Sequence, residues 1–137
     1  MKKIFFSLLL CGVSAIVFAA TGTNRLSEGV VVQANGNDIG EFKRALVLAS
    51  NMREVLTKAK FEIVVYGPSV QFLTAFSDAL PLIQKVQSEG IKVIACGRSL
   101  ETEKVALSDL APEIKVVQFG AVHIVNREKQ GWQYIKP

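Results

Sequence analysis

Apolar residues follow two rhythms along the chain: short unbroken runs, and longer segments in which they recur every three or four residues. The unbroken runs predict five strands, at about residues 29–33, 60–66, 91–95, 114–119 and 132–136. The inner runs do not alternate with polar residues, which is typical of strands in a parallel sheet that is covered on both faces. We therefore expect a parallel sheet with helices on both sides.

The segments between the runs have helical patterns. The longest extends from Asp38 to about Lys58, and its apolar positions form one wide stripe, made of Phe42, Ala45, Leu46, Ala49, Met52, Val55 and Leu56. Asp38 followed by Glu41 predicts a capping box, in which the Asp38 side chain accepts a backbone N–H. Shorter helices are predicted at residues 70–76 with Ser69 as the cap, at 81–89 with Gly90 as the stop, at 101–107 and at 121–129.

Strands that alternate with helices place the chain in the α/β class. Its 137 residues suffice for one domain. Helical crossovers between parallel strands are right-handed and cover the faces of the sheet. We therefore predict a three-layer α/β/α sandwich around a mostly parallel five-stranded sheet.

The first twenty residues have the pattern of an export signal. Two lysines precede an apolar run over residues 4–17, and Val17 and Ala19 fit the −3 and −1 positions of a cleavage site. One alternative is a retained membrane anchor, for which about 17 residues is the lower limit; another is a lipoprotein anchored at Cys11, which lacks a small residue before it. We predict a periplasmic protein of a bacterium without membrane attachment after cleavage, with a signal peptide at 1–19, a flexible lead-in at 20–27 and a domain at 28–137.

Composition and motifs exclude several classes of function. Lysine and arginine number 16 against 12 acidic residues, and the net charge of +4 falls to +2 (14 − 12) without Lys2 and Lys3; no basic stripe suggests nucleic-acid binding. The sequence has no phosphate-binding loop, dinucleotide fingerprint, Gly-x-Ser-x-Gly elbow or His-Glu-x-x-His motif. Two cysteines and one histidine cannot form a structural zinc site. We therefore predict no cofactor, no metal and no nucleic-acid partner, and a structural or surface role for His123.

Cys96 is the main candidate for chemistry. It is the one cysteine left after signal cleavage, and it follows the predicted strand at 91–95, at the carboxyl end where α/β sheets place their sites. In the predicted exit turn at 96–99, Gly97 leaves room above the sulfur, while Arg98 and a following helix N-terminus favour the thiolate. The other interpretation is a small, inert, buried side chain, and both interpretations stay open at this point.

A succession of short motifs covers nearly the whole domain in a recognisable order. It consists of the stretch from Ala45 to Asn51, Glu62-Ile63-Val64-Val65-Tyr66-Gly67-Pro68, Gly90-Ile91-Lys92-Val93-Ile94-Ala95-Cys96-Gly97, the stretch from Val116 to Gly120, and the stretch from Gln130 to Pro137. On these motifs, residues 26–137 resemble the DsrE/DsrF-like (DsrEFH-like) family of sulfur-relay proteins and their relatives, in its exported, single-domain branch. Tyr66 stands where relatives commonly have histidine, and Leu48 stands where they often have asparagine.

The resemblance implies a three-layer fold, homo-oligomers that are often trimers or hexamers, and chemistry at Cys96. In the sulfur-relay members a cysteine carries sulfur as a persulfide and passes it to a partner. We therefore expect a periplasmic sulfur carrier or sulfurtransferase that acts through Cys96, with a sulfur donor and a sulfur acceptor as partners. The residues expected to line the site are Gly97, Arg98, Asn51, Tyr66 and Gly67. The alternative is a non-catalytic, oligomeric module of the same fold that binds a small ligand at the strand ends, and the reactivity of the thiol distinguishes the two.

Overall fold

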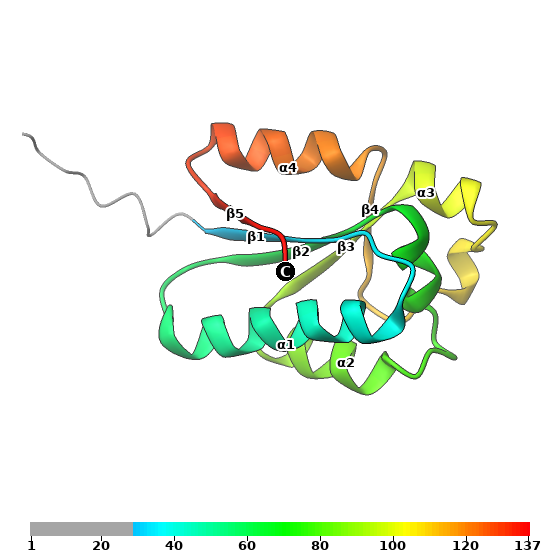
Figure 1. Cartoon of the computed structure of the whole chain (residues 1–137), viewed down its shortest axis with the longest axis horizontal. Helices are drawn as coiled ribbons and strands as arrows, with labels where there is room; N and C mark the ends of the chain where they lie inside the picture. Colours follow the sequence, from blue (N-terminus) through cyan, green and yellow to red (C-terminus); the bar gives the residue numbers. More distant parts are fainter. Residues whose placement is uncertain (1–28) are drawn as a thin grey trace, which may run out of the picture.

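The computed structural model describes residues 29–137, which contain a five-stranded sheet (Figure 1). The strands are β1 (Val30–Ala34), β2 (Phe61–Val65), β3 (Lys92–Cys96), β4 (Lys115–Val117) and β5 (Gln133–Ile135). They lie in the order β4-β3-β2-β1-β5, and every neighbouring pair is parallel. The five predicted strands and the α/β class are confirmed, and the sheet is wholly parallel. The predicted signal peptide and lead-in lie outside the described residues.

Helices cover both faces of the sheet and form the predicted three layers. α1 (Ile39–Val55) and α2 (Leu80–Ser88) pack together on one face, and α4 (Gly120–Lys129) covers the other (Figure 1). α3 (Gly97–Thr102) and two 3₁₀ helices, η2 (Gly67–Leu73) and η3 (Leu107–Asp109), lie in the connections. Within residues 29–137, none of the helices has the length and apolar character that crossing a membrane requires.

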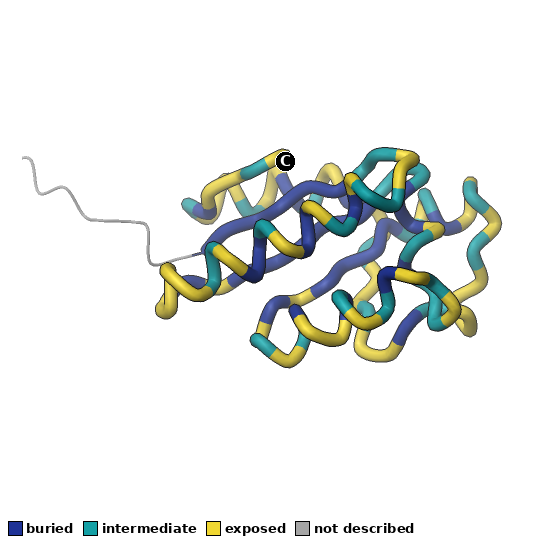
Figure 2. Tube along the Cα trace, turned by 60° about the horizontal axis from the view of Figure 1, so that its bottom comes forward, coloured by how far each residue is buried: buried dark blue, intermediate teal, exposed yellow. Residues whose placement is uncertain are grey.

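The three inner strands, β1, β2 and β3, are buried except at Lys92, as their unbroken apolar runs predict (Figure 2). Successive side chains of a strand point to opposite faces, so the sheet contributes to two separate cores. The larger core lies beneath α1 and α2 and includes Phe42, Leu46, Ile63 and Ile83. The smaller core lies beneath α4, and its buried members are Val31, Val64, Ile94, Ile124 and Trp132.

Local sequence determines where α1 begins. The Asp38 carboxylate accepts the Glu41 backbone N–H at 2.9 Å, which confirms the predicted cap. The helix ends at Val55, three residues before the predicted end, and both Val55 and Leu56 are exposed. The predicted apolar stripe is therefore wrong at its last two positions, Val55 and Leu56, because the end of α1 lies beyond the core.

The helix after β2 begins earlier than predicted. η2 starts at Gly67 because Pro68 fits the first turn of a helix, where its missing N–H costs nothing. Ser69 therefore lies inside η2 and is not its cap. Its hydroxyl donates instead to the Gly36 carbonyl oxygen at 2.6 Å, which fastens η2 to the end of β1.

The helix after β3 also begins directly at a strand end. α3 starts at Gly97, so the predicted exit turn at 96–99 is the beginning of a helix, and α3 ends at Thr102, five residues before the predicted end. The predicted stop at Gly90 is confirmed: α2 ends at Ser88, and Gly90 has a φ of +81°, which favours glycine. The connections after β2 and β3 are thus tighter than the sequence pattern indicates, and they bring helix N-termini to the carboxyl edge of the sheet.

Candidate functional site

The carboxyl ends of β3 and β4 lie side by side, but the chain leaves them toward different faces of the sheet. After β3 it enters α3, whose Leu100 belongs to the core beneath α1 and α2. After β4 it enters α4, on the opposite face (Figure 1). In open α/β sheets a crevice forms where neighbouring strands connect to opposite faces, and ligands bind there. The topology therefore selects the carboxyl end of β3 as the candidate site.

Cys96 occupies this position. It is the last residue of β3 and the N-cap of α3, and it is only 6% exposed. A β-carbon placed on Gly120 would lie 3.1 Å from the Cys96 Cβ and 3.2 Å from the Val64 Cγ1. These distances are tighter than ordinary contacts, so the glycine lets the first turn of α4 approach the cysteine this closely.

The polar groups around Cys96 lower the pKa of its thiol. Burial raises the pKa of the thiol, but the Ser99 hydroxyl and the backbone N–H groups of Gly120, Ser99 and Arg98 stabilise the thiolate, and the pKa is lowered overall. The Sγ atom also lies 3.8 Å from the Gln118 carbonyl oxygen, which accepts from the protonated thiol. The surroundings of the sulfur therefore shift the thiol toward the thiolate.

Ser99 connects the sulfur to the end of β2. Its hydroxyl oxygen accepts the Gly67 backbone N–H at 2.8 Å, so its own hydrogen stays available for Cys96. Gly67 has a φ of +58°, a left-handed conformation that favours glycine. The structure thus brings the predicted residue Gly67 to the site through its backbone. The sequence analysis did not single out Ser99, although its spacing of three residues from Cys96 places it in the first turn of any helix that starts at the strand end.

Gly97 and Arg98, the two residues that follow Cys96, line a hollow. The hollow has a volume of about 660 Å³ and lies between α3 and the connection from β4 to α4, which contributes Gln118 and Phe119. The Arg98 guanidinium lies 3.3 Å from the Glu101 carboxylate, and both side chains are mostly exposed to water. The guanidinium is therefore paired in water, whereas its charge was predicted to act on the sulfur. The Arg98 backbone N–H donates to the Gln118 carbonyl oxygen at 3.1 Å.

Tyr66 lies next to Cys96, one residue beyond the end of β2. Its pKa is raised, first by burial and then by the proximity of Tyr134 and Cys96, while a hydrogen bond with Gln33 lowers it. The phenol therefore stays protonated and neutral near pH 7. The Tyr134 hydroxyl donates to the Gln33 Oε1 at 2.5 Å, which adds a second polar contact on the face that α4 covers.

Asn51 is the predicted site residue that the structure does not bring to Cys96. It lies in the last turns of α1, in a hollow of about 180 Å³ between α1 and α2 that Ser50 and Lys85 also line. The side chain of Cys96 lies on the other face of the sheet, against Gly120. The prediction failed because motif order along the chain does not tell which face of the sheet a helix will cover.

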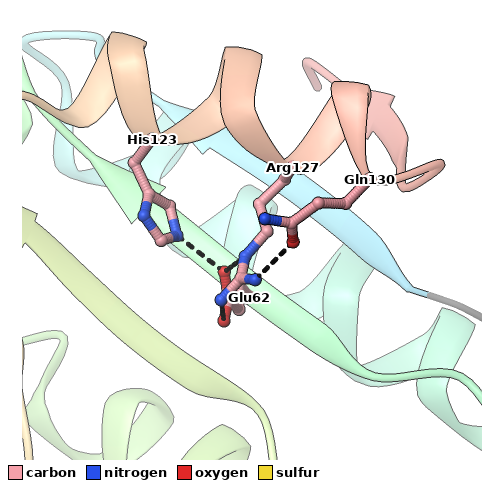
Figure 3. A network of polar contacts seen from close by, with 4 residues as sticks. All are labelled: Glu62, His123, Arg127 and Gln130. Atoms are coloured by element: carbon pink, nitrogen blue, oxygen red, sulfur yellow. Dashed lines mark hydrogen bonds and ion pairs between the residues drawn. The ribbon is translucent and has the colours of Figure 1, made fainter.

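A buried carboxylate lies beneath α4, at the other end of the same face (Figure 3). Glu62 of β2 is 1% exposed, and both of its oxygens accept from Arg127: Oε2 from Nε at 2.8 Å and Oε1 from Nη2 at 2.7 Å. The His123 Nε2 lies 2.8 Å from the Glu62 Oε2, and Gln130 accepts from the Arg127 Nη1 at 2.8 Å. We call Glu62, His123 and Arg127 the α4 clamp.

The α4 clamp keeps its carboxylate charged. Burial raises the pKa of Glu62, but hydrogen bonds and charge from Arg127 and His123 lower it more, so the pKa falls below its ordinary value overall. The structural role predicted for His123 agrees with its place in the clamp. Glu62 itself was missed, although a single acidic residue inside the run from Phe61 to Val65 is a recognisable signal of a buried charge that needs a partner.

The chemistry available at the carboxyl edge is that of a thiol with a lowered pKa and the phenol of Tyr66 beside it. Among residues 29–137, no three histidine, cysteine, aspartate or glutamate side chains are grouped so that they could hold a metal ion. A thiolate with a lowered pKa is a nucleophile near neutral pH. The arrangement therefore fits reactions at sulfur.

The fold is similar to those of several solved structures. MTH1491 from Methanobacterium thermoautotrophicum, a protein of unknown function, is 28% identical, with a TM-score of 0.71 over 80% of this chain and 99% of that chain. The ychN protein from E. coli is 13% identical, with a TM-score of 0.71 over the same shares of the two chains. BT1422 from Bacteroides thetaiotaomicron, a conserved protein of unknown function, is 18% identical, with a TM-score of 0.65 over 81% of this chain and 95% of that chain. No family model and no curated protein matches the chain, so these similarities establish the fold.

Proposed function

We propose that the protein is a DsrE/DsrF-like sulfur carrier or sulfurtransferase that works through Cys96. One observation carries the proposal: the thiol lies at the carboxyl end of β3, where neighbouring strands connect to opposite faces. The lowered pKa of this thiol supports the same assignment. The motif succession that resembles the family supports the same assignment. Sulfur transfer needs a nucleophilic thiolate and little else, which matches a site built on one cysteine.

The proposed reaction has two steps. The Cys96 thiolate attacks the outer sulfur of a donor such as thiosulfate; a new S–S bond forms at Cys96, the S–S bond of the donor breaks, and sulfite leaves with the electron pair. A thiolate of the acceptor then attacks the outer sulfur of the Cys96 persulfide. The acceptor becomes the persulfide, and Cys96 returns as the thiolate, so no external oxidant or reductant is consumed. The neighbouring N–H and O–H groups stabilise the sulfur anion at the start and end of each cycle.

Mass spectrometry tests the proposal directly. The chain is incubated with thiosulfate or polysulfide, and the peptide that contains Cys96 is expected to gain the mass of one sulfur atom. Cys96→Ser is expected to abolish the gain, and Cys11→Ser serves as the matched control that retains it. If Cys96 in the folded protein reacts with a maleimide but gains no sulfur from either donor, sulfur transfer is not its function.

A ligand-binding module is the second candidate, and the low exposure of Cys96 favours it. A polar hollow of about 380 Å³ lies at the same edge of the sheet, beyond β1, where Asn35, Arg44, Ser69 and Lys136 contribute to its lining. In that case Cys96 would be a core residue, and the thiol would resist a maleimide until the protein unfolds. Cys96→Ser would then lower the melting temperature by several degrees, because losing the packing of a buried side chain costs about 1 kcal/mol or more. Under the carrier proposal, the same variant melts close to the wild type.

Assembly and export complete the proposal. Exposed apolar side chains gather around β4 and the outer side of α4, namely Val116, Phe119, Val122 and Val125, which supports a homo-oligomer such as a trimer or hexamer. A sedimentation mass equal to one chain at micromolar concentration would contradict this.

We also propose that the chain is exported to the periplasm, and sequencing the N-terminus of protein recovered from that compartment tests cleavage after Ala19.

A further inference from the structure

Polar contacts hold much of α4 to the sheet. Two residues of this helix, Gly120 and Ile124, are buried, and the first of them has no side chain. Ile124 packs into the smaller core with Val64 and Trp132. The remaining attachment is the α4 clamp, in which Arg127 binds the Glu62 carboxylate with two hydrogen bonds and also lies 4.6 Å above the Trp132 ring.

The clamp and the thiol contact lie along one side of the helix. His123 and Arg127 follow Gly120 by three and seven residues, about one and two helical turns, so the three positions share a face. Contacts two turns apart fix the rotation of α4 about its axis and its position along that axis. Since a β-carbon on Gly120 would already lie 3.1 Å from Cys96, small displacements of the helix change this contact.

We propose that the α4 clamp positions the first turn of α4 against Cys96, so that Glu62 and Arg127 are positioning residues for the thiol. Glu62 pairs with Lys92, at the far end of β3 from Cys96, and therefore acts through the helix. The inference rests on the proposed function, because it takes Cys96 as the reactive residue. It adds which residues hold the surroundings of the sulfur in place.

The surroundings of the sulfur explain why the position of α4 matters. Tyr66 faces it from β2, and the charge of Arg98 in α3 is paired with Glu101 in water. α4 contributes the Gly120 N–H, its first turn carries no acidic residue, and His123 is paired with Glu62 in the clamp. Loosening the clamp therefore removes a backbone donor while the other groups near the sulfur stay in place.

The test is a titration of the thiolate by its ultraviolet absorbance in the full chain with Cys11→Ser, from which the trace of the same chain with Cys96→Ala is subtracted. Absorbance does not depend on access to the sulfur. Arg127→Gln is expected to raise the midpoint of the titration by about one pH unit, the size expected when one hydrogen bond to an anion is lost. Arg127→Lys keeps the charge but loses the paired donors, and a smaller rise is expected.

Ile83→Val is the matched control, because it loosens the core on the opposite face. It should lower the melting temperature and leave the titration midpoint unchanged. The proposal is overturned if folded Arg127→Gln titrates like the wild type, or if Ile83→Val shifts the midpoint equally. If Arg127→Gln does not fold, Arg127→Lys and His123→Gln are judged by the same criteria. The titration uses no sulfur donor, so a failure of sulfur uptake rejects the carrier function alone, and an unshifted midpoint rejects the positioning role alone.

Discussion

The two faces of the sheet are built from alternate residues of the same strands, yet they differ in chemistry. In the inner strands, the side chains that face α1 and α2 are all apolar: Val30, Val32, Ala34, Phe61, Ile63, Val65, Val93 and Ala95. The side chains between them, which face α4, include Gln33, Glu62, Tyr66 just beyond β2, and Cys96. One face holds most of the apolar burial, and the other combines a small core with the thiol and the buried ion pair.

The difference shows how a small domain can hold a costly polar site. Burying Glu62 beneath α4 needs compensation from Arg127 and His123. A thick apolar layer on the other face lets the chain keep this arrangement without unfolding. The two faces should therefore respond to substitution in different ways, and the following experiments separate their contributions.

The largest effect is expected in the larger core. Phe42→Ala removes a ring that is 1% exposed between α1 and the sheet, and it should lower the free energy of unfolding by about 3–5 kcal/mol. Val55→Ala, at the exposed end of α1, is the control and should change it by less than about 0.5 kcal/mol. Denaturant unfolding measures both. Equal losses in the two variants would show that the α1 face is not the main source of stability.

A smaller loss is expected when the buried carboxylate is neutralised. Glu62→Gln keeps the volume but leaves Arg127 without a charge partner, and it should cost about 2–3 kcal/mol at neutral pH. This figure is reduced from that of a fully buried pair because the Arg127 side chain is 25% exposed. Glu101→Gln breaks the exposed pair with Arg98 and is the matched control, with no measurable loss. A Glu62→Gln chain as stable as this control would mean that the clamp does not stabilise the fold.

The stabilisation from Glu62 should also disappear in acid. Because the clamp lowers the pKa of Glu62 below its ordinary value of 4.5, its contribution is fully present above that value and is lost as the pH falls through the lower pKa of the folded state. The gap in unfolding free energy between wild type and Glu62→Gln should therefore narrow between neutral pH and about pH 3. A gap that stays constant over this range would contradict the assignment, and using the difference between the two chains removes the contribution of other carboxylates, such as Glu89.

The smallest effect on stability is expected at the thiol. Ser99→Ala removes the hydroxyl donor to Cys96 and leaves the Gly67 N–H without its acceptor. It should raise the pKa of Cys96 by up to about one unit and cost about 1 kcal/mol. The pH dependence of alkylation at Cys96 and a thermal melt measure the two quantities. Ser108→Ala, in an exposed turn, should change neither. A lower melting temperature with an unchanged pH dependence of alkylation would mean that Ser99 only stabilises the fold.

The sequence predicts the strands of this protein well because burial leaves a strong local pattern. Unbroken runs such as Ile63-Val64-Val65 identify the sheet, and Gly90 identifies a helix end through its own conformational freedom. The starts of η2 and α3 were less clear, because one residue separates β2 from η2 and none separates β3 from α3, so no turn sequence marks the start of either helix.

The site could be predicted only at its centre. Cys96 was predicted from its place after an apolar strand, and Tyr66 and Gly67 from a motif of the family resemblance. Gly120 is far from Cys96 in the sequence and reaches the sulfur only because α4 crosses to the opposite face. Asn51 was misplaced for the complementary reason, since α1 covers the other face. Knowing which helix covers which face is thus the information that a single sequence lacks.

The order of elements along the chain also sets the order in which the two faces are completed during synthesis. β1, β2, β3, α1 and α2 all precede α4, and β5 pairs with β1 only after α4 has been made. The α1 face can therefore assemble while Cys96 and Glu62 still lack their cover. Until the last helix docks, the thiol is open to any oxidant that the chain meets. The fraction of oxidised Cys96 in newly made protein would then report the time that passes before α4 docks on the sheet.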